Sequence, residues 1–272
     1  MAVRLIFLSH IHEEKELALL IKQALETEFS GFMEVFVSSD GASIPAGTNF
    51  LTKIEDGLVS CVGAIYLISP ISVKRNWVNF ELGAVWIRNI MSVRLNDEEI
   101  PAIPVCHSGI SPGALPSPLN NLNAILGNQV SQLEFAFRSL QKVVGGEGVL
   151  KTDFDMLATQ VVEFERQYTL GSSIKKLLTL LGGQIDDIRS LIQNCEQQPA
   201  GSMTTMQCGF IDTYKVQELQ ALEGTALKGI IKVNIGTAGI NFSDKTKTVN
   251  GANVSVLVPV SLILEFKEQL IA

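Results

Sequence analysis

Short apolar segments alternate with segments of helical periodicity over the first 110 residues, and this order restricts the fold more than any other feature of the chain. The apolar segments are rich in β-branched and aromatic residues, and they predict strands over residues 3–8, 33–37, 61–68 and 102–106. Apolar residues three or four positions apart predict helices over residues 13–29, 50–58 and 77–90. Because the strands are apolar almost throughout and alternate with helices, we expect a parallel sheet covered by helices on both faces.

The second half of the chain has a different pattern. Gly145, Gly146 and Gly148 predict a flexible join, after which apolar residues follow 4-3-4-3 spacing from Leu150 to Tyr168. A second segment of the same kind begins after Gly171 and Ser172, so the two segments form either a helical hairpin or a coiled-coil pairing face.

A second break at residues 197–202 precedes a β-rich tail, with strands predicted at 230–235, 240–242 and 254–266 and a polar loop or hairpin over residues 243–253. We therefore predict three parts: an α/β domain over residues 1–145, a helical hairpin or coiled-coil segment over 146–199, and a β-rich part over 200–272 that serves in sensing or oligomerisation.

Charge and cysteine content exclude several classes of partner. The net charge is −7 and both halves are acidic, so there is no cluster of Lys and Arg for nucleic acid or an anionic membrane. The four cysteines form no CxxC pair and the three histidines complete no zinc ligand set, so we expect no metal. The apolar stretch at residues 1–8 is too short to span a membrane, and we expect a cytoplasmic protein with reduced thiols.

Common phosphate-binding and hydrolase motifs are absent from the sequence. There is no GxGxxG after the first strand, and no GxxxxGK[ST], GxSxG or HExxH. In parallel sheets, ligands bind beyond the carboxyl ends of the strands, which here are followed by residues 9–10, 38–49 and 69–77.

Trp77 and Glu81 stand four residues apart at the start of the third predicted helix, so they share one side of it near such an edge. A carboxylate beside an aromatic surface can hold ribose hydroxyls or stabilise an oxocarbenium-like centre. The same spacing also occurs for a packed aromatic beside a solvated charge, and the pair alone does not separate these interpretations.

Four motifs follow one another along the first part of the chain: FLSH at residues 7–10, VFV at 35–37 followed by the loop 40–47, LISP at 67–70, and NWVNFEL at 76–82. Their order and spacing resemble the Toll/interleukin-1 receptor (TIR) domain, in particular that of bacterial proteins of the NAD-cleaving type. PVCH at 104–107 and the proline-rich segment 111–119 also resemble the later part of bacterial members. The resemblance covers residues 1–145, and the remaining residues resemble no family that we recognise.

This resemblance implies a flavodoxin-like fold and, for many members, cleavage of NAD+ between nicotinamide and ribose, with NAD+ as substrate and no cofactor. Glu81 matches the catalytic glutamate and Trp77 the aromatic residue four positions before it. The other implied substrate-binding residues are Ser9 and His10 at the end of the first strand, Phe36 at the end of the second, and Ser38 and Asp40 in the loop that covers the site. Several active members carry a basic or aromatic residue where Ile11 and His12 stand, so the chain departs from the pattern there.

The implied function is an NAD+ hydrolase that gives ADP-ribose or a cyclic ADP-ribose. Its activation by self-association through the TIR domain and the C-terminal region, and a role as a bacterial antiviral defence effector, are implied in the same way. Two alternatives stay open: a non-enzymatic module that recruits other TIR domains, and an N-glycosyl transferase acting on nucleosides.

Overall fold

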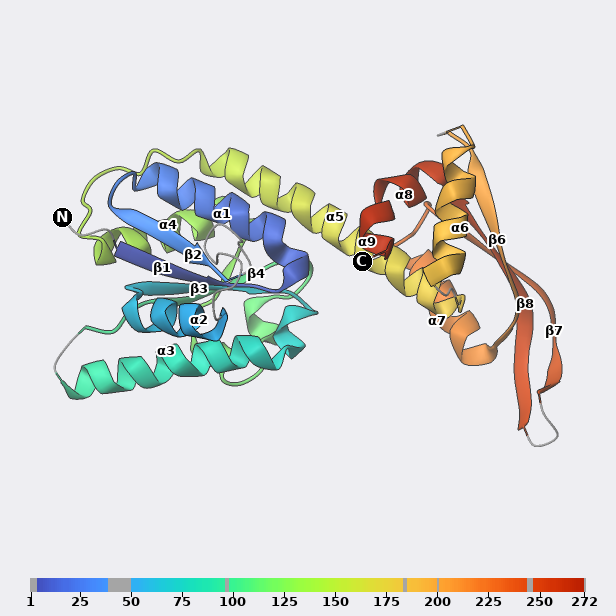
Figure 1. The fold of residues 1–272 in the computed structure, drawn as a ribbon, viewed down its shortest axis with the longest axis horizontal. Coiled ribbons are helices and arrows are strands. Elements are labelled where there is room, and N and C mark those ends of the chain that lie inside the picture. Colours follow the sequence, from blue (N-terminus) through green and yellow to red (C-terminus); the bar gives the residue numbers. More distant parts are fainter. Residues whose placement is uncertain are drawn as a thin grey trace. The chain divides into compact units, whose positions relative to one another are not determined.

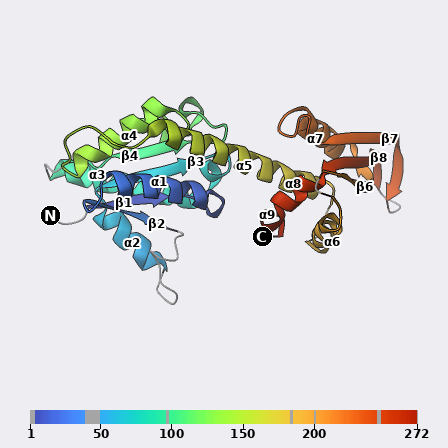
Figure 2. The same ribbon diagram turned by 90° about the horizontal axis from the view of Figure 1, so that it is seen from above.

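In a computed structural model, the chain divides into two compact units, Met1–Tyr168 and Thr169–Ala272. The structure describes residues 4–38, 50–95, 98–182, 185–199, 201–243 and 247–271. Figures 1 and 2 label the helices and strands of both units.

The first unit contains a five-stranded parallel sheet with the order β2-β1-β3-β4-β5. Its strands are β1 (Arg4–Ser9), β2 (Met33–Val37), β3 (Gly63–Ile68), β4 (Ala102–Cys106) and β5 (Ile125–Leu126). The register places Phe7 of β1 between Phe36 of β2 and Ala64 of β3. All six residues of β3 are buried, which is why this strand is apolar throughout.

Helices cover both faces of this sheet. One face packs against α1 (Lys15–Glu28), α4 (Val130–Val143) and the first part of α5 (Phe154–Leu180), and the other against α2 (Phe50–Ser60) and α3 (Asn76–Arg94) (Figure 1). Alternate residues of each strand pack into the two cores, because successive side chains of a strand point to opposite faces of the sheet. In β1, Ile6 and Leu8 belong to the core under α1, whereas Phe7 belongs to the core under α2 and α3. The predicted flavodoxin-like architecture is confirmed.

Helix α5 differs from the prediction of two segments that break at Gly171 and Ser172. It is one helix of 27 residues. A glycine inside a helix costs only about 1 kcal/mol, and apolar packing on both sides of Gly171 outweighs that cost. Phe154 and Val161 are buried in the first core, and Ile174 and Leu178 are buried in the second. The apolar residues therefore pack within the chain, and residues 146–168 belong to the unit that contains the sheet.

The second unit contains an antiparallel sheet with the order β6-β8-β7. The strands are β6 (Met203–Asp212), β7 (Lys232–Ser243) and β8 (Lys247–Pro259), and the helices are α6 (Ile185–Glu196), α7 (Thr213–Gly224), α8 (Val260–Glu265) and α9 (Lys267–Ile271). At Gly251 of β8, a Cβ atom would lie 2.0 Å from the carbonyl oxygen of Ile211, so only glycine fits there. The predicted β-rich tail is confirmed.

Two details of the tail differ from the prediction. Residues 260–265 form α8 instead of extending a strand, because Val260, Ile263 and Phe266 are buried at helical spacing. The sequence analysis also missed β6, whose burial alternates between half-exposed and exposed residues. Of the two forms left open for residues 243–253, the hairpin is confirmed, since β7 and β8 pair as far as Ser243 and Lys247.

Candidate functional site

The predicted catalytic residue, Glu81, is wholly buried at the carboxyl edge of the parallel sheet. It lies in the second turn of α3, which begins eight residues after β3 ends. Ser9, the last residue of β1, is also wholly buried, and it pairs in register with Tyr66 of the neighbouring strand β3. The sheet and the start of α3 therefore bring together residues that are far apart in the sequence.

Within the part of the chain that the structure describes, three side chains hold Glu81. The hydroxyl of Ser9 donates to Oε2 at 2.5 Å, and the indole Nε1–H of Trp77 donates to Oε1 at 2.8 Å. The hydroxyl of Tyr66 donates to the backbone carbonyl of Glu81 at 3.3 Å. The two hydrogen bonds to the carboxylate come from neutral donors, so they orient it without neutralising its charge.

This environment changes the acidity of the group. Burial raises the pKa of Glu81 from 4.5 to about 7, against the opposing effect of the hydrogen bonds from Ser9 and Trp77. Near pH 7 the ionised and neutral forms therefore coexist. Burial also raises the pKa of Tyr66 well above 10, and the negative charge of Glu81 adds to that effect. Strongly shifted groups of this kind are common at functional sites.

Trp77 connects the buried carboxylate to the surface. Its side chain is 39% exposed, and its ring stacks on that of Phe80, with 5.1 Å between ring centroids. An exposed aromatic surface that also holds a buried carboxylate is suited to a planar ring attached to a sugar. The predicted residues Ser9, Trp77 and Glu81 thus form one cluster.

The other predicted substrate-binding residues lie around this cluster in different settings. His10 follows Ser9 and is buried, and burial lowers its pKa to about 4, so its ring is neutral at pH 7. Phe36 is half-buried and stacks on Phe7, with 5.7 Å between ring centroids. Ser38 is buried just after β2. Asp40 and the rest of the predicted covering loop, apart from Ser38, lie outside the described residues.

Sequence reasoning missed a second polar cluster at the same edge. Glu14 and His107 are almost wholly buried, and 3.2 Å separates Oε1 of Glu14 from Nε2 of His107. The ring of His107 packs edge-on against Tyr168 of α5. Nothing in the sequence marks Glu14 as buried, because acidic residues at a helix start are usually solvated.

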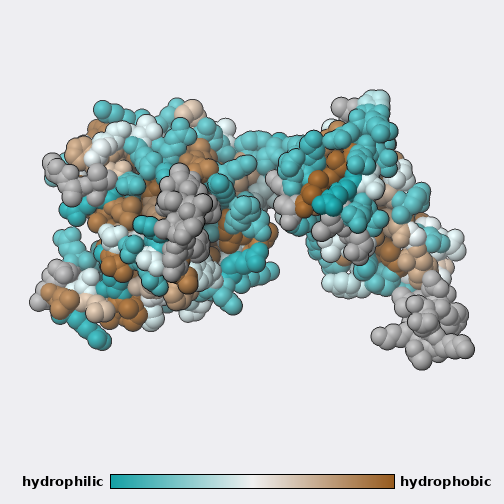
Figure 3. Space-filling view, viewed as in Figure 1, coloured by the Kyte–Doolittle hydropathy of each residue, from teal (hydrophilic) through white to brown (hydrophobic). Residues whose placement is uncertain are grey.

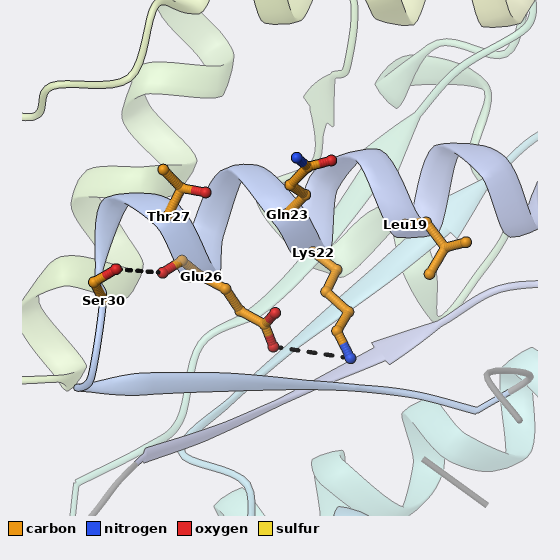
Figure 4. A pocket seen from close by; sticks show the side chains of 6 residues that line it. All are labelled: Leu19, Lys22, Gln23, Glu26, Thr27 and Ser30. Carbon is orange, nitrogen blue, oxygen red and sulfur yellow. Dashed lines mark hydrogen bonds and ion pairs between the residues drawn. The ribbon is translucent and has the colours of Figure 1, made fainter. Parts of the chain in front are cut away.

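Two further findings bear on the kind of site. Within the described residues, no group of three or more His, Cys, Asp or Glu side chains is arranged to hold a metal ion. An open hollow lies along α1 and contains none of the predicted site residues (Figure 4). Its lining consists of Leu19, Lys22, Gln23, Glu26, Thr27 and Ser30.

These features define the first unit as a flavodoxin-like α/β domain with a buried, hydrogen-bonded carboxylate at the carboxyl edge of its sheet. Residues 6–125 match the family model described as the TIR domain. This part of the chain is a TIR domain, as the sequence motifs predicted.

Comparisons beyond the family model are weak. No curated protein matches the chain. It is similar to two solved structures of a metazoan TIR-STING receptor from C. gigas, one of them in complex with 2',3'-cGAMP. The identities are 14% and 16%, the TM-scores 0.37 and 0.38, and the matches cover 97% and 96% of this chain and 76% and 74% of those chains. The assignment therefore depends on the family model and on the fold. No helix among the described residues is long and apolar enough to cross a membrane.

Proposed function

We propose that the TIR domain cleaves NAD+ at the bond between nicotinamide and ribose, with Glu81 as the catalytic residue. The observation that carries the proposal is the setting of this carboxylate: it is wholly buried, held by neutral donors, and adjoins the exposed ring of Trp77. A structural carboxylate in the same position would more commonly be paired with a cation, because an unpaired buried charge is costly.

The chemistry needs one carboxylate. Nicotinamide leaves a cationic pyridinium as a neutral molecule, so no acid has to protonate it. As the bond breaks, positive charge develops on the ribose, and the anionic form of Glu81 would stabilise it. An ionised carboxylate offers about four acceptor positions, and Ser9 and Trp77 occupy two. The remaining positions would accept the hydroxyls of the nicotinamide ribose.

The second half of the reaction decides the product. Attack by water on the ribose gives ADP-ribose and releases one proton, whereas attack by another group of the same ADP-ribosyl unit gives a cyclic product. Trp77 and Phe80 provide the aromatic surface on which a planar ring would stack.

The test compares the full chain with Glu81→Gln. The amide oxygen can still accept from Trp77 and the amide nitrogen can donate to Ser9, so the substitution removes the charge and preserves the contacts. We expect nicotinamide release, followed by chromatography over a series of protein concentrations, to fall at least ~100-fold. Glu16→Gln is the matched control, because Glu16 is exposed on α1. Equal release by wild type and Glu81→Gln at every concentration would refute the proposal.

The exposed apolar residues of α3 favour a second role, as a surface for self-association. Trp86, Ile87 and Met91 of α3 and Leu95 just after it are 55–70% exposed, and Figure 3 shows apolar surface where α3 lies. Contiguous exposed apolar groups often mark interaction sites.

The non-enzymatic alternative requires this surface and not Glu81, so Glu81→Gln would retain full biological effect. The transferase alternative requires release of free base when deoxynucleosides replace NAD+. Activation by assembly, participation of the C-terminal unit and the defence role stay predictions.

A further inference from the structure

Glu14 links two segments at the carboxyl edge of the sheet. Its Oε2 accepts a hydrogen bond from the backbone N–H of Ile11 at 3.1 Å, and its Oε1 lies 3.2 Å from Nε2 of His107. Ile11 is two residues after Ser9, and His107 directly follows β4. This one carboxylate therefore ties the segment after β1 to the end of β4.

His107 in turn contacts helix α5. Its ring packs edge-on against Phe164 and Tyr168, with centroid distances of 5.7 and 5.6 Å, and its Nδ1 lies 3.0 Å from the hydroxyl of Ser108. Glu165, between the two aromatic residues, accepts from the backbone N–H of Ser108 at 2.9 Å. The end of β4 is thus held against one turn of α5.

Tyr168 makes a second connection, to the segment after β3. Its hydroxyl lies 3.1 Å from the hydroxyl oxygen of Ser69. That same oxygen accepts from the backbone N–H groups of Ile71 and Ser72 at 3.2 and 3.1 Å, and so shapes the turn that leads into α3. Burial raises the pKa of Tyr168 to about 12, so its hydroxyl stays protonated.

Both connections end next to the partners of Glu81. The segment held through Glu14 begins at Ser9, and the turn held through Tyr168 leads to Trp77, five residues after Ser72. We infer that Glu14, His107 and Tyr168, named here the α5 clamp, are positioning residues that set the geometry of Ser9 and Trp77 around Glu81. The expected effect of the α5 clamp on catalysis rests on the proposed function. Its expected effect on the geometry around Glu81 is independent of that function.

The indole N–H of Trp77 reports on this geometry directly. The chain has two tryptophans, so a ¹H–¹⁵N spectrum of the full chain has two indole signals, which Trp86→Phe assigns. The chemical shift of the Trp77 indole should change with pH as Glu81 titrates, with a midpoint near its pKa of about 7. The indole of Trp86 is 60% exposed, and its shift should not follow this titration.

The test applies Tyr168→Phe, which removes the hydroxyl and keeps the ring against His107, and Glu14→Gln, which removes the charge. We expect each to move the Trp77 signal by more than its line width and to change its titration midpoint, while the Trp86 signal stays in place. The controls are Tyr214→Phe, at a tyrosine 67% exposed in the second unit, and Glu16→Gln, and both should match wild type. Unchanged Trp77 signals in both clamp variants would overturn the inference. A Trp77 signal that changes in Glu14→Gln and not in Tyr168→Phe would overturn the positioning role of Tyr168 and helix α5.

Kinetics add a second measurement. We expect Tyr168→Phe to lower kcat for NAD+ about 10-fold with a smaller change in KM, since a misplaced catalytic group slows the reaction more than it weakens binding. Tyr214→Phe should keep the wild-type kcat, and an equal kcat in Tyr168→Phe would count against the clamp. If wild type releases no nicotinamide, the proposed function fails, and the Trp77 signal still decides the inference.

Discussion

Glu14 and Glu81 are both wholly buried at the carboxyl edge of one sheet, but their partners differ. Glu14 lies against the ring of His107 and accepts from a backbone amide. Among the described residues, Glu81 accepts from the neutral side chains of Ser9 and Trp77 at its two oxygens, and its pKa is raised to about 7. Burial by itself therefore does not define the role of a carboxylate. The partners decide whether the group ties segments together or keeps a charge available for a ligand.

If Glu14 is the structural member of the pair, its removal should cause the largest loss of stability. We expect Glu14→Ala to lower the free energy of unfolding by about 3 kcal/mol, because His107 and the N–H of Ile11 lose a buried partner. Urea unfolding followed by tryptophan fluorescence measures this, since Trp77 and Trp86 both lie in the first unit. A loss of unfolding free energy no larger than that of Glu16→Ala would show that Glu14 contributes no more to stability than a surface glutamate.

If Glu81 is the functional member, catalysis should depend on its ionised form. With a pKa of about 7, the ionised fraction, and with it kcat/KM for NAD+, should fall about 100-fold from pH 8 to pH 5. Initial rates of nicotinamide release across this range test the expectation. A rate that rises as the pH falls would instead indicate an acid role for Glu81.

The same carboxylate should destabilise the folded protein when ionised. Its pKa in the fold, about 7, exceeds the ordinary 4.5, so its contribution to stability is complete below pH 4.5 and is lost as the pH rises through 7. Because glutamine does not ionise, Glu81→Gln should raise the free energy of unfolding by about 3 kcal/mol at pH 8 and leave it nearly unchanged at pH 4.5. Urea unfolding at both values measures this, and a variant that is less stable at pH 8 would contradict it.

The smallest effect is expected at Ser9. Its hydrogen bond lowers the pKa of Glu81, so Ser9→Ala should move the midpoint of the pH profile upward and reduce the rate at pH 7 about threefold. Ser60→Ala, at an exposed serine of α2, is the matched control. A midpoint that stays in place or moves down would show that Ser9 does not set the acidity of Glu81.

Local patterns predicted the parts of the molecule that depend on neighbouring residues. The four main strands of the parallel sheet follow from continuous apolar runs, and the shared side of Trp77 and Glu81 follows from the helical period of 3.6 residues. The same reasoning failed at Val260–Glu265, where a short apolar run suits a strand and a helix equally well, and only packing in the second core decides.

The amino-acid sequence by itself thus determined the α/β order of the first unit, its TIR motifs and the placement of Glu81 one helical turn after Trp77. Only the tertiary structure brought Ser9 to Glu81 across 72 residues, and joined Glu14 to His107 and Tyr168 to Ser69. The physical reason is that such contacts depend on strand order and register, which arise from the packing of the whole sheet. The acidity of Glu81 follows from that packing as well, because burial is a property of the assembled edge and of no single segment.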